Sequence, residues 1–166
     1  VVMGVAGCGK TSVGEALAGE TGATFLDGDA LHPPENIAKM SAGTPLNDAD
    51  RAPWLHEVGL SLKAQDGRIL IGCSALKRSY RNIIRAAAEE PVAFIHLHGS
   101  KDVIKGRMST REGHFMPTSL LDSQFAALET LGPDETGRRI DIAQPFKAVV
   151  TDSVSFMKEA FAWASA

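Results

Sequence analysis

The sequence contains few cysteines and no long apolar run. Cys8 and Cys73 are the only cysteines among 166 residues, too few for a disulfide framework in a chain of this size, so two reduced thiols in a cytoplasmic protein are expected. The longest apolar runs, residues 69–73 and 91–95, are far shorter than the roughly 20 residues that span a bilayer. No membrane anchor is therefore expected.

The sequence also lacks a strong excess of charge of either sign. Seventeen Lys and Arg stand against 20 Asp and Glu, a formal net charge of −3, which gives no global attraction to nucleic acid or to a membrane. With 44% hydrophobic and 22% charged residues, the composition is that of an ordinary globular protein, and residues 1–166 are expected to form one domain. Because the chain opens inside an apolar stretch without an initiator Met, we expect further residues to precede Val1.

Apolar runs alternate with helical patterns along the chain, and no internal repeat is visible. Helices are expected over residues 11–21, 33–40, 50–65, 79–89, 101–108, 118–131 and 146–163. Strands are expected over residues 1–3, 23–26, 68–73, 92–97 and 139–142. Because parallel strands need long crossovers, this alternation predicts an α/β fold with three layers and about five parallel strands. Ligands are then expected at the carboxyl ends of those strands.

A phosphate-binding loop follows the first expected strand directly. The eight residues fit G-x-x-x-x-G-K-[ST] in full, and they are Gly4, Val5, Ala6, Gly7, Cys8, Gly9, Lys10 and Thr11. The glycines let backbone N–H groups turn toward phosphate oxygens, and the following helix adds its positive dipole end. Lys10 supplies a cation for the β- and γ-phosphates, while the Thr11 hydroxyl is suited to Mg²⁺. The sequence therefore predicts ATP and Mg²⁺ binding, with no redox role for Cys8.

Missing motifs narrow the class of nucleotide-binding protein. An Asn-Lys-x-Asp motif, which reads guanine in GTP-dependent switches, is absent from the sequence. The expected strand 68–73 ends without the Asp that many ATPases use for magnesium, and the chain is too short for a motor. The class of nucleotide-binding protein that remains is a small phosphotransferase whose acceptor is another small molecule.

Two carboxylates, Asp27 and Asp29, follow the second expected strand and flank Gly28. Both are expected to face the phosphate loop across the same edge of the sheet. Asp29 is suited to bind an acceptor hydroxyl and take its proton, and Asp27 to hold magnesium through water. The alternative is a simple Asp-Gly turn without a chemical role.

The motifs taken together resemble the small P-loop gluconate kinases. The resemblance rests on the phosphate loop and on further blocks that span nearly the whole chain, which are DGDALHP at 27–33, NIxKM at 36–40, GTPLNDxDRxPWL at 43–55, CSALKRxYR at 73–81, GHFM at 113–116, SQF at 123–125 and DIxQP at 141–145. It implies ATP-dependent phosphorylation of D-gluconate to 6-phosphogluconate by a cytoplasmic homodimer. The implied fold is that of the shikimate and nucleoside monophosphate kinases.

Cationic residues are expected to bind the carboxylate of a sugar-acid acceptor. Candidates that follow expected strand ends are His32, Arg51, Lys77 and Arg81. An arginine can grip a carboxylate through two parallel hydrogen bonds, and either Arg51 or Arg81 is suited to this role. The alternatives are a helix-start residue for His32 and a solvated helix face for Arg81.

Residues 107–117 correspond to the segment that forms a mobile lid over ATP in related kinases. Arg107 and Arg111 lie four residues apart, on one face of a helix, and are candidates for stabilising charge on the transferring phosphoryl group. His114 is a candidate contact to the acceptor, and related kinases pack the adenine where Gln144 and Pro145 stand here. The lid lies at the end of a basic stretch, residues 77–111, with eight Lys and Arg against three Asp and Glu.

Two other functions remain possible from the sequence. One is a sibling kinase that acts on shikimate or on a nucleotide. The other is a protein that senses ATP without transferring a phosphoryl group. The blocks around His32 and from Cys73 to Lys77 count against the first, and the complete set of Lys10, Thr11 and both aspartates counts against the second.

Overall fold

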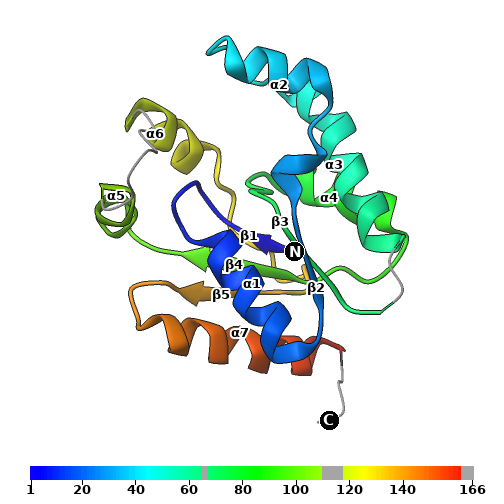
Figure 1. Ribbon diagram of the computed structural model, residues 1–166, viewed down its shortest axis with the longest axis vertical. Helices are drawn as coiled ribbons and strands as arrows, with labels where there is room; N and C mark the ends of the chain where they lie inside the picture. The colour runs from blue at the N-terminus through cyan, green and yellow to red at the C-terminus, as the bar shows by residue number, and fades with distance from the viewer. Residues whose placement is uncertain (65–66, 110–117, 162–166) are drawn as a thin grey trace.

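The structure is a computed structural model that describes residues 1–64, 67–109 and 118–161. Its centre is one parallel sheet in which the strands follow the order β2-β3-β1-β4-β5 (Figure 1). The strands are β1 Val2–Met3, β2 Thr24–Asp27, β3 Ile69–Gly72, β4 Phe94–His98 and β5 Gly137–Asp141. The sequence prediction of a five-stranded parallel α/β sheet is confirmed.

Helices connect the strands, as parallel pairing requires. They are α1 Lys10–Thr21, the short 3₁₀ helix η1 Gly28–Leu31, α2 Pro34–Ser41, α3 Asp48–Lys63, α4 Arg78–Ala88, α5 Lys101–Ser109, α6 Thr118–Ala127 and α7 Phe146–Phe161. Helix α3 begins at a capping box, in which Asn47 accepts from the Asp50 N–H and Asp50 accepts from the Asn47 N–H. Among the described helices, none is long and apolar enough to cross a membrane.

Alternate residues of the strands point to two separate hydrophobic cores. Val2 and Leu70 pack with α1 and α7, whereas their neighbours Met3 and Ile71 pack with α3 and α4. Both faces of the sheet are thus covered, which explains why the strands read as continuous apolar runs. The three-layer architecture follows from these two cores.

Most expected elements differ from the observed ones by one to three residues at their ends, and two differences have a clear cause. The helix expected over 33–40 is preceded by η1, because Pro33 adopts an extended conformation and α2 starts at Pro34. The last strand starts at Gly137 rather than at 139, because Gly137 pairs with Phe94 at the edge of the sheet.

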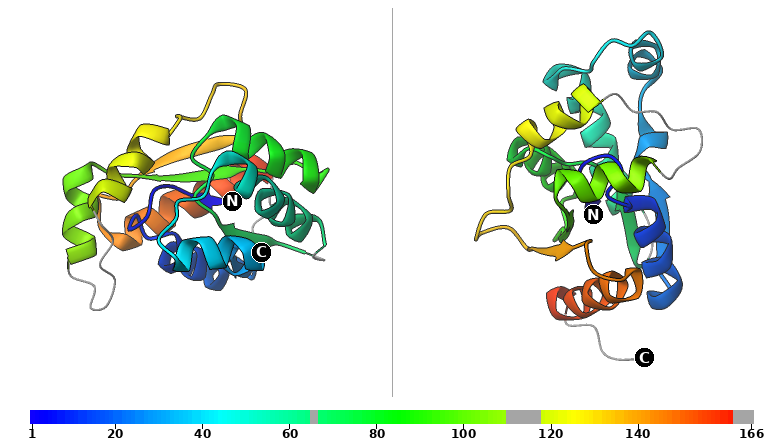
Figure 2. Two further views of the ribbon diagram at one scale, coloured as in Figure 1. Left: turned by 90° about the horizontal axis from the view of Figure 1, so that it is seen from above. Right: turned by 90° about the vertical axis from the view of Figure 1, so that its left-hand side faces the viewer.

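The two ends of the sheet differ in what surrounds them. Helices α2 and α6 lie at the end where β1 runs into the loop before α1, and the right-hand view of Figure 2 shows both above that loop. The helix N-termini that follow β1 and β3 lie at the same end, since every strand runs in the same direction. This carboxyl edge is where the sequence places its candidate residues.

Candidate active site at the carboxyl edge

The phosphate loop is held in shape by glycines with positive φ. Gly4 has φ +144° and a Cβ there would lie 2.7 Å from the Leu97 carbonyl oxygen, so no side chain fits. Gly9, at φ +99°, is the N-cap of α1 and turns the chain into the helix. The loop therefore has the geometry in which backbone N–H groups and a helix N-terminus are offered to phosphate.

Lys10 is folded over the first half of the phosphate loop. Its Nζ donates to the carbonyl oxygens of Gly4 at 3.1 Å and Val5 at 3.3 Å. Thr11 is exposed in the first turn of α1, so its hydroxyl is accessible to a cation. Among the described residues no group of three or more His, Cys, Asp or Glu is placed to hold a metal.

Cys8 takes part in the loop only through its backbone. Its side chain is fully buried in the core between α1 and α7, and burial raises the pKa of the thiol. A buried, protonated thiol is a poor nucleophile, which agrees with the prediction that Cys8 has no redox role.

Helices α5 and α6 contact the phosphate loop directly. Met108 of α5 lies against Gly7, where an added Cβ would be 2.6 Å from the Met108 Cγ. Gln124 of α6 accepts a hydrogen bond of 2.7 Å from the Ala6 backbone N–H. Arg107 of α5 lies near Gly9 and donates to the Ile142 carbonyl, so it joins the phosphate loop to the turn after β5.

Asp27, Gly28 and Asp29 lie at the end of β2, as predicted. The Asp27 carboxylate accepts from the Asp29 N–H at 3.0 Å, and both side chains are exposed. Gly28 packs against the neighbouring strand, since a Cβ there would lie 2.5 Å from the Gly72 carbonyl oxygen. Gly72 in turn lies close to the Lys10 Cβ. The tight packing of Gly28 brings the two carboxylates to the same edge as the start of α1.

His32 is positioned by Trp54. The two rings stack with their centroids 4.1 Å apart, and the Trp54 Nε1–H donates to the Gly28 carbonyl at 2.7 Å. Asn36 lies 3.3 Å from the His32 Nδ1 through its own side-chain nitrogen. Partial burial lowers the pKa of His32, which therefore remains neutral at pH 7. Trp54 is a core residue, as expected, but it also fixes the turn that carries Asp29.

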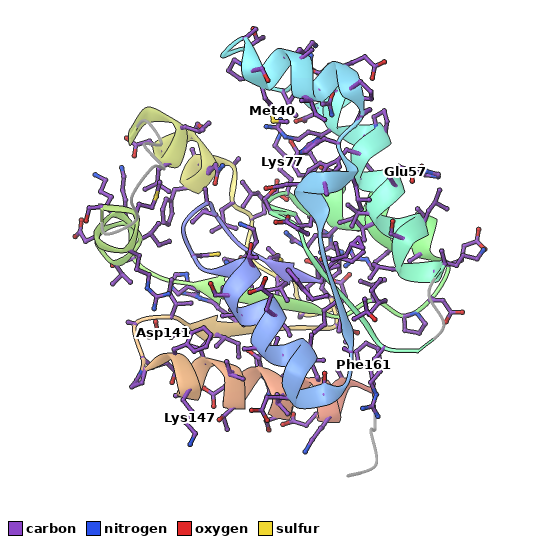
Figure 3. The ribbon with its side chains drawn as sticks, in the orientation of Figure 1. Met40, Glu57, Lys77, Asp141, Lys147 and Phe161 are labelled. Carbon is purple, nitrogen blue, oxygen red and sulfur yellow. The ribbon has the colours of Figure 1, made fainter. Side chains whose placement is uncertain are left out.

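Arg51 and Lys77 meet at one polar cluster, which also contains Tyr80 and Asp48. Lys77 donates to both Asp48 oxygens, at 3.0 and 2.8 Å, and the Tyr80 hydroxyl donates to Asp48 at 2.5 Å. Arg51 and Lys77 both lie over the Tyr80 ring. The hydrogen bonds from Lys77 and Tyr80 lower the pKa of Asp48, so the cluster carries two positive charges and one negative charge. Figure 3 places Lys77 between α2 and the sheet.

Arg81 belongs to the interior of the protein and not to this cluster. Its side chain has no exposed surface, and Glu135 accepts from Nε at 2.7 Å and from Nη2 at 2.8 Å. The other guanidinium N–H groups donate to backbone carbonyls, which belong to Ala75, Leu76, Glu129 and Thr130. We therefore correct the expectation that Arg81 grips the acceptor, because all its donors are already bonded to the protein.

The remaining predicted residues lie at the turn after β5 or outside the described part of the chain. Gln144 donates to Asp152 at 2.9 Å, and Pro145 caps the start of α7 through its carbonyl oxygen. Both lie just after the Ile142 carbonyl that Arg107 contacts. Arg111 and His114 lie outside the described residues.

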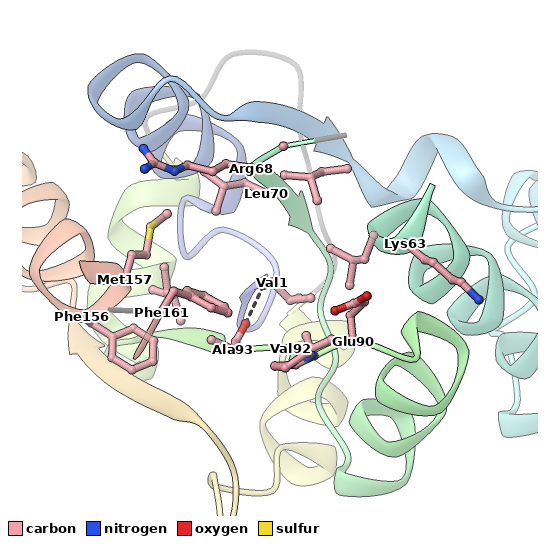
Figure 4. Close-up of a pocket in the computed structure, with 15 residues that line it drawn as sticks. Val1, Lys63, Arg68, Leu70, Glu90, Val92, Ala93, Phe156, Met157 and Phe161 are labelled. Carbon is pink, nitrogen blue, oxygen red and sulfur yellow. Dashed lines mark hydrogen bonds between the residues drawn. The ribbon is translucent and has the colours of Figure 1, made fainter. Parts of the chain in front are cut away.

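A hollow of about 310 Å³ lies at the opposite edge of the sheet (Figure 4). Apolar side chains such as Leu70, Val92 and Phe156 form most of its lining. It lies at the amino ends of β3 and β4 and contains none of the predicted site residues. We do not assign it to the site, because ligands of parallel sheets bind at the carboxyl ends of the strands.

Four residues of the site were given no role from the sequence: Asn36, Asp48, Tyr80 and Gln124. Each lies inside or beside a motif block on which the family resemblance rests, and that membership was the available signal. Apart from the contact of Asn36 with His32 four residues away, their partners lie 14 to 118 residues away in the chain, where no local pattern reveals them.

The sheet order, the loop and the lysine folded over it define a P-loop kinase fold. A family model described as shikimate kinase matches residues 6–130. The sequence is 52% identical over 144 residues to the gluconokinase of Gluconobacter oxydans, covering 84% of this chain and 80% of that protein. The chain belongs to the gluconokinase family.

Two further relatives extend the match over nearly the whole chain. The thermoresistant gluconokinase of Escherichia coli is 43% identical over 163 residues, covering 96% of this chain and 93% of that protein. The crystal structure of a gluconokinase from Sinorhizobium meliloti superimposes with a TM-score of 0.87 at 48% identity, over 95% of this chain and 90% of that chain.

Proposed function

We propose that the protein transfers the γ-phosphoryl group of ATP to D-gluconate and forms 6-phosphogluconate. The observation that supports this most directly is the pairing of a phosphate loop with a cationic cluster at the same sheet edge. The net positive charge of Arg51, Lys77 and Asp48 suits an acceptor with a single carboxylate. Membership of the gluconokinase family supports gluconate as that acceptor.

The nucleotide side combines the backbone of the phosphate loop with the side chains of Lys10, Thr11 and Asp27. Apart from the Ala6 N–H, which donates to Gln124, the loop from Gly4 to Gly9 offers N–H groups to the phosphates, and Lys10 exchanges its carbonyl partners for β- and γ-phosphate oxygens. Mg²⁺, bound to Thr11 and through water to Asp27, would neutralise charge on the phosphates. Gln144 and Pro145 are proposed to border the adenine, beside the Ile142 carbonyl that Arg107 contacts.

The acceptor side orients the hydroxyl that receives the phosphoryl group. Asp29 binds that hydroxyl and takes its proton, while His32, held against Trp54, donates or accepts a further hydrogen bond. Arg51 and Lys77 bind the carboxylate at the other end of the acceptor. Arg81 does not contact the acceptor in this proposal, because its side chain is bound to Glu135 in the interior of the protein.

Charge on the transferring group requires cations beyond Lys10. Arg107 is proposed to stabilise it together with Arg111, and residues 107–117 to form the lid that excludes water. His114 is proposed as a contact to the acceptor from the same segment. The protein is further proposed to act as a cytoplasmic homodimer.

The function is tested by the release of ADP in a coupled assay with Mg²⁺ and a panel of acceptors. We expect turnover with gluconate to exceed that with shikimate, nucleoside monophosphates and other sugar acids. Turnover with shikimate alone would favour the second candidate, shikimate kinase, which the match of residues 6–130 supports. ATP binding without turnover of any acceptor would instead indicate a nucleotide sensor.

The role of Asp29 is tested by Asp29→Asn. The amide keeps the size of the side chain but cannot take a proton, so kcat should fall about 100-fold with little change in the KM for ATP. Steady-state kinetics with both substrates varied separates the two constants. A near-native kcat would show that Asp29 is not a general base. Such a result is compatible with phosphoryl transfer, because its loose transition state does not require early removal of the hydroxyl proton.

A further inference from the structure

Gln124 and Lys10 contact the same peptide group of the phosphate loop. The Val5 carbonyl oxygen accepts from the Lys10 Nζ at 3.3 Å, and the Ala6 N–H of that peptide donates to the Gln124 Oε1 at 2.7 Å. A peptide unit is planar, so the direction of its N–H fixes the direction of its C=O. Whatever orients Ala6 N–H therefore also orients the oxygen that Lys10 contacts.

The Gln124 side chain accepts a hydrogen bond from a backbone N–H, that of Ala6, which takes part neither in the sheet nor in α1. Ala6 lies between the end of β1 at Met3 and the start of α1 at Lys10, where no ladder or helical bond uses its N–H. The 2.7 Å separation is at the short end of the range for an N–H donor to oxygen. The bond links residues 118 positions apart, so it depends on how α6 packs.

Helix α6 is well anchored around Gln124. Leu121 is 2% exposed in the core between α1 and α7, and Phe125 packs against that core. Asp122 forms an ion pair with Lys101 of α5. Because the neighbours on both sides of Gln124 are fixed, its side-chain amide has a defined position relative to the loop.

We propose that Gln124 is a positioning residue that sets Lys10 for phosphate binding through the Val5–Ala6 peptide. When Gln124 holds the Ala6 N–H, the Val5 carbonyl stays directed at the Lys10 ammonium, which holds that ammonium over the loop until phosphate oxygens replace the carbonyls. The position of α6 is thereby coupled to the cation that binds the phosphates. This inference rests on the proposed role of Lys10 in nucleotide binding, but not on the identity of the acceptor.

The test is a double-mutant cycle on the dissociation constant for ATP, measured by calorimetry with the full chain. Gln124→Met keeps the length of the side chain and removes the acceptor, and it should weaken ATP binding about five- to tenfold. In a Lys10→Met background the same change should have less than a twofold effect, because the lysine through which it acts is gone. Ser123→Ala, at an exposed neighbour that bonds only within its own helix, should bind ATP like the unmodified protein.

A second readout follows the bond itself. Hydrogen exchange at the Ala6 amide should be at least tenfold faster in Gln124→Met and unchanged in Ser123→Ala. Should Gln124→Met fail to fold, Gln124→Asn serves, because it withdraws the acceptor by one methylene and keeps the amide.

The outcomes that would overturn the proposal are distinct. Equal weakening of ATP binding in both backgrounds would show that Gln124 acts independently of Lys10. Unchanged Ala6 exchange would show that the bond does not protect that amide. Loss of gluconate turnover with the coupling intact would overturn the proposed function alone, since the cycle measures only ATP binding.

Discussion

The proposed nucleotide side and the proposed acceptor side of the site are built in different ways. The nucleotide side is a continuous segment, residues 4–11, whose shape depends on backbone geometry and on close contacts with Leu97 and Met108. The acceptor side joins side chains from separate segments, in which Lys77 and Tyr80 share the carboxylate of Asp48. The nucleotide side presents a fixed backbone surface, whereas the acceptor side presents polar side chains that form hydrogen bonds with one another.

This difference suggests how each side contributes to the reaction. Backbone N–H groups can bind the phosphates of any nucleoside triphosphate. Their main effect is to stabilise the transferring phosphoryl group, whose charge changes during the reaction. Side chains on the acceptor side distinguish one small molecule from another. A molecule that leaves one of these polar side chains without a hydrogen-bond partner binds with a less favourable free energy. Substitutions of Lys10 on the nucleotide side should therefore lower kcat, and those of the carboxylate-binding residues Arg51 and Lys77 on the acceptor side should raise the KM for the acceptor.

The largest effect is expected for Lys10→Met. Methionine keeps the length of the side chain but removes the cation that reaches the β- and γ-phosphates, so kcat should fall by about 10³ or more. The coupled assay at saturating ATP measures this, with thermal unfolding as a control for folding. A kcat within tenfold of the unmodified protein would contradict the proposed division between the two sides.

Arg81→Met should reduce stability rather than acceptor binding. It leaves the buried carboxylate of Glu135 with Arg85 and a backbone N–H as its remaining partners, so the free energy of unfolding should fall by about 3 kcal/mol or more. Denaturant titration measures the loss, and the KM for gluconate should stay within twofold.

The matched control for that variant is the double substitution Arg81→Met with Glu135→Gln. Removal of both charges should recover part of the lost stability, because no unpaired charge stays buried. A stable Arg81→Met protein with a strongly raised KM for gluconate would return Arg81 to the acceptor site.

Lys77→Met should act on the acceptor alone. Loss of one charged hydrogen bond to the substrate carboxylate should raise the KM for gluconate about 10- to 100-fold and change the KM for ATP less than twofold. Lys147→Met is the matched control, since Lys147 is an exposed lysine of α7 away from the cluster (Figure 3). Equal effects on both KM values would show that the two sides are not separate.

The same contrast explains what the sequence could predict. The phosphate loop and the strands that lead to it follow from local patterns, because glycine spacing and apolar runs are properties of contiguous residues, whereas the order of the strands in the sheet comes from the structure. Asp27 ends β2 and Asp29 lies two residues further on in η1, so the predicted strand was enough to bring both to the carboxyl edge of the sheet. The single parallel sheet followed from the alternation of strands and helices.

The burial and the contacts of individual polar side chains could not be predicted in the same way. Arg51 and Arg81 both follow helix starts and both looked able to bind a carboxylate, yet one is partly exposed and the other is enclosed by Glu135. The difference arises from residues 129–135, which fold back onto α4 from about 50 positions away. Partners so distant in sequence leave no local signal.

The smallest effect is expected at His96, which lies on β4 away from both sides of the site. Its Nδ1 is buried without a partner among the described residues, and burial together with His98, Arg139 and Arg81 lowers its pKa to about 4. The unfolded chain takes up this proton near pH 6.5 and the folded protein only near pH 4, so stability should fall as the pH decreases between these values.

His96→Leu removes this titration and leaves that of His98 in place. Between pH 7 and pH 5 the unmodified protein should lose about 2 kcal/mol more stability than the variant, as measured by denaturant titration at each pH. Both KM values should remain unchanged at pH 7.5, because His96 contacts neither substrate in the proposed site. If the two proteins lose stability in parallel, the pKa of His96 is the same in the folded and the unfolded chain, and the acid sensitivity of the fold between pH 7 and pH 5 must then come from other groups.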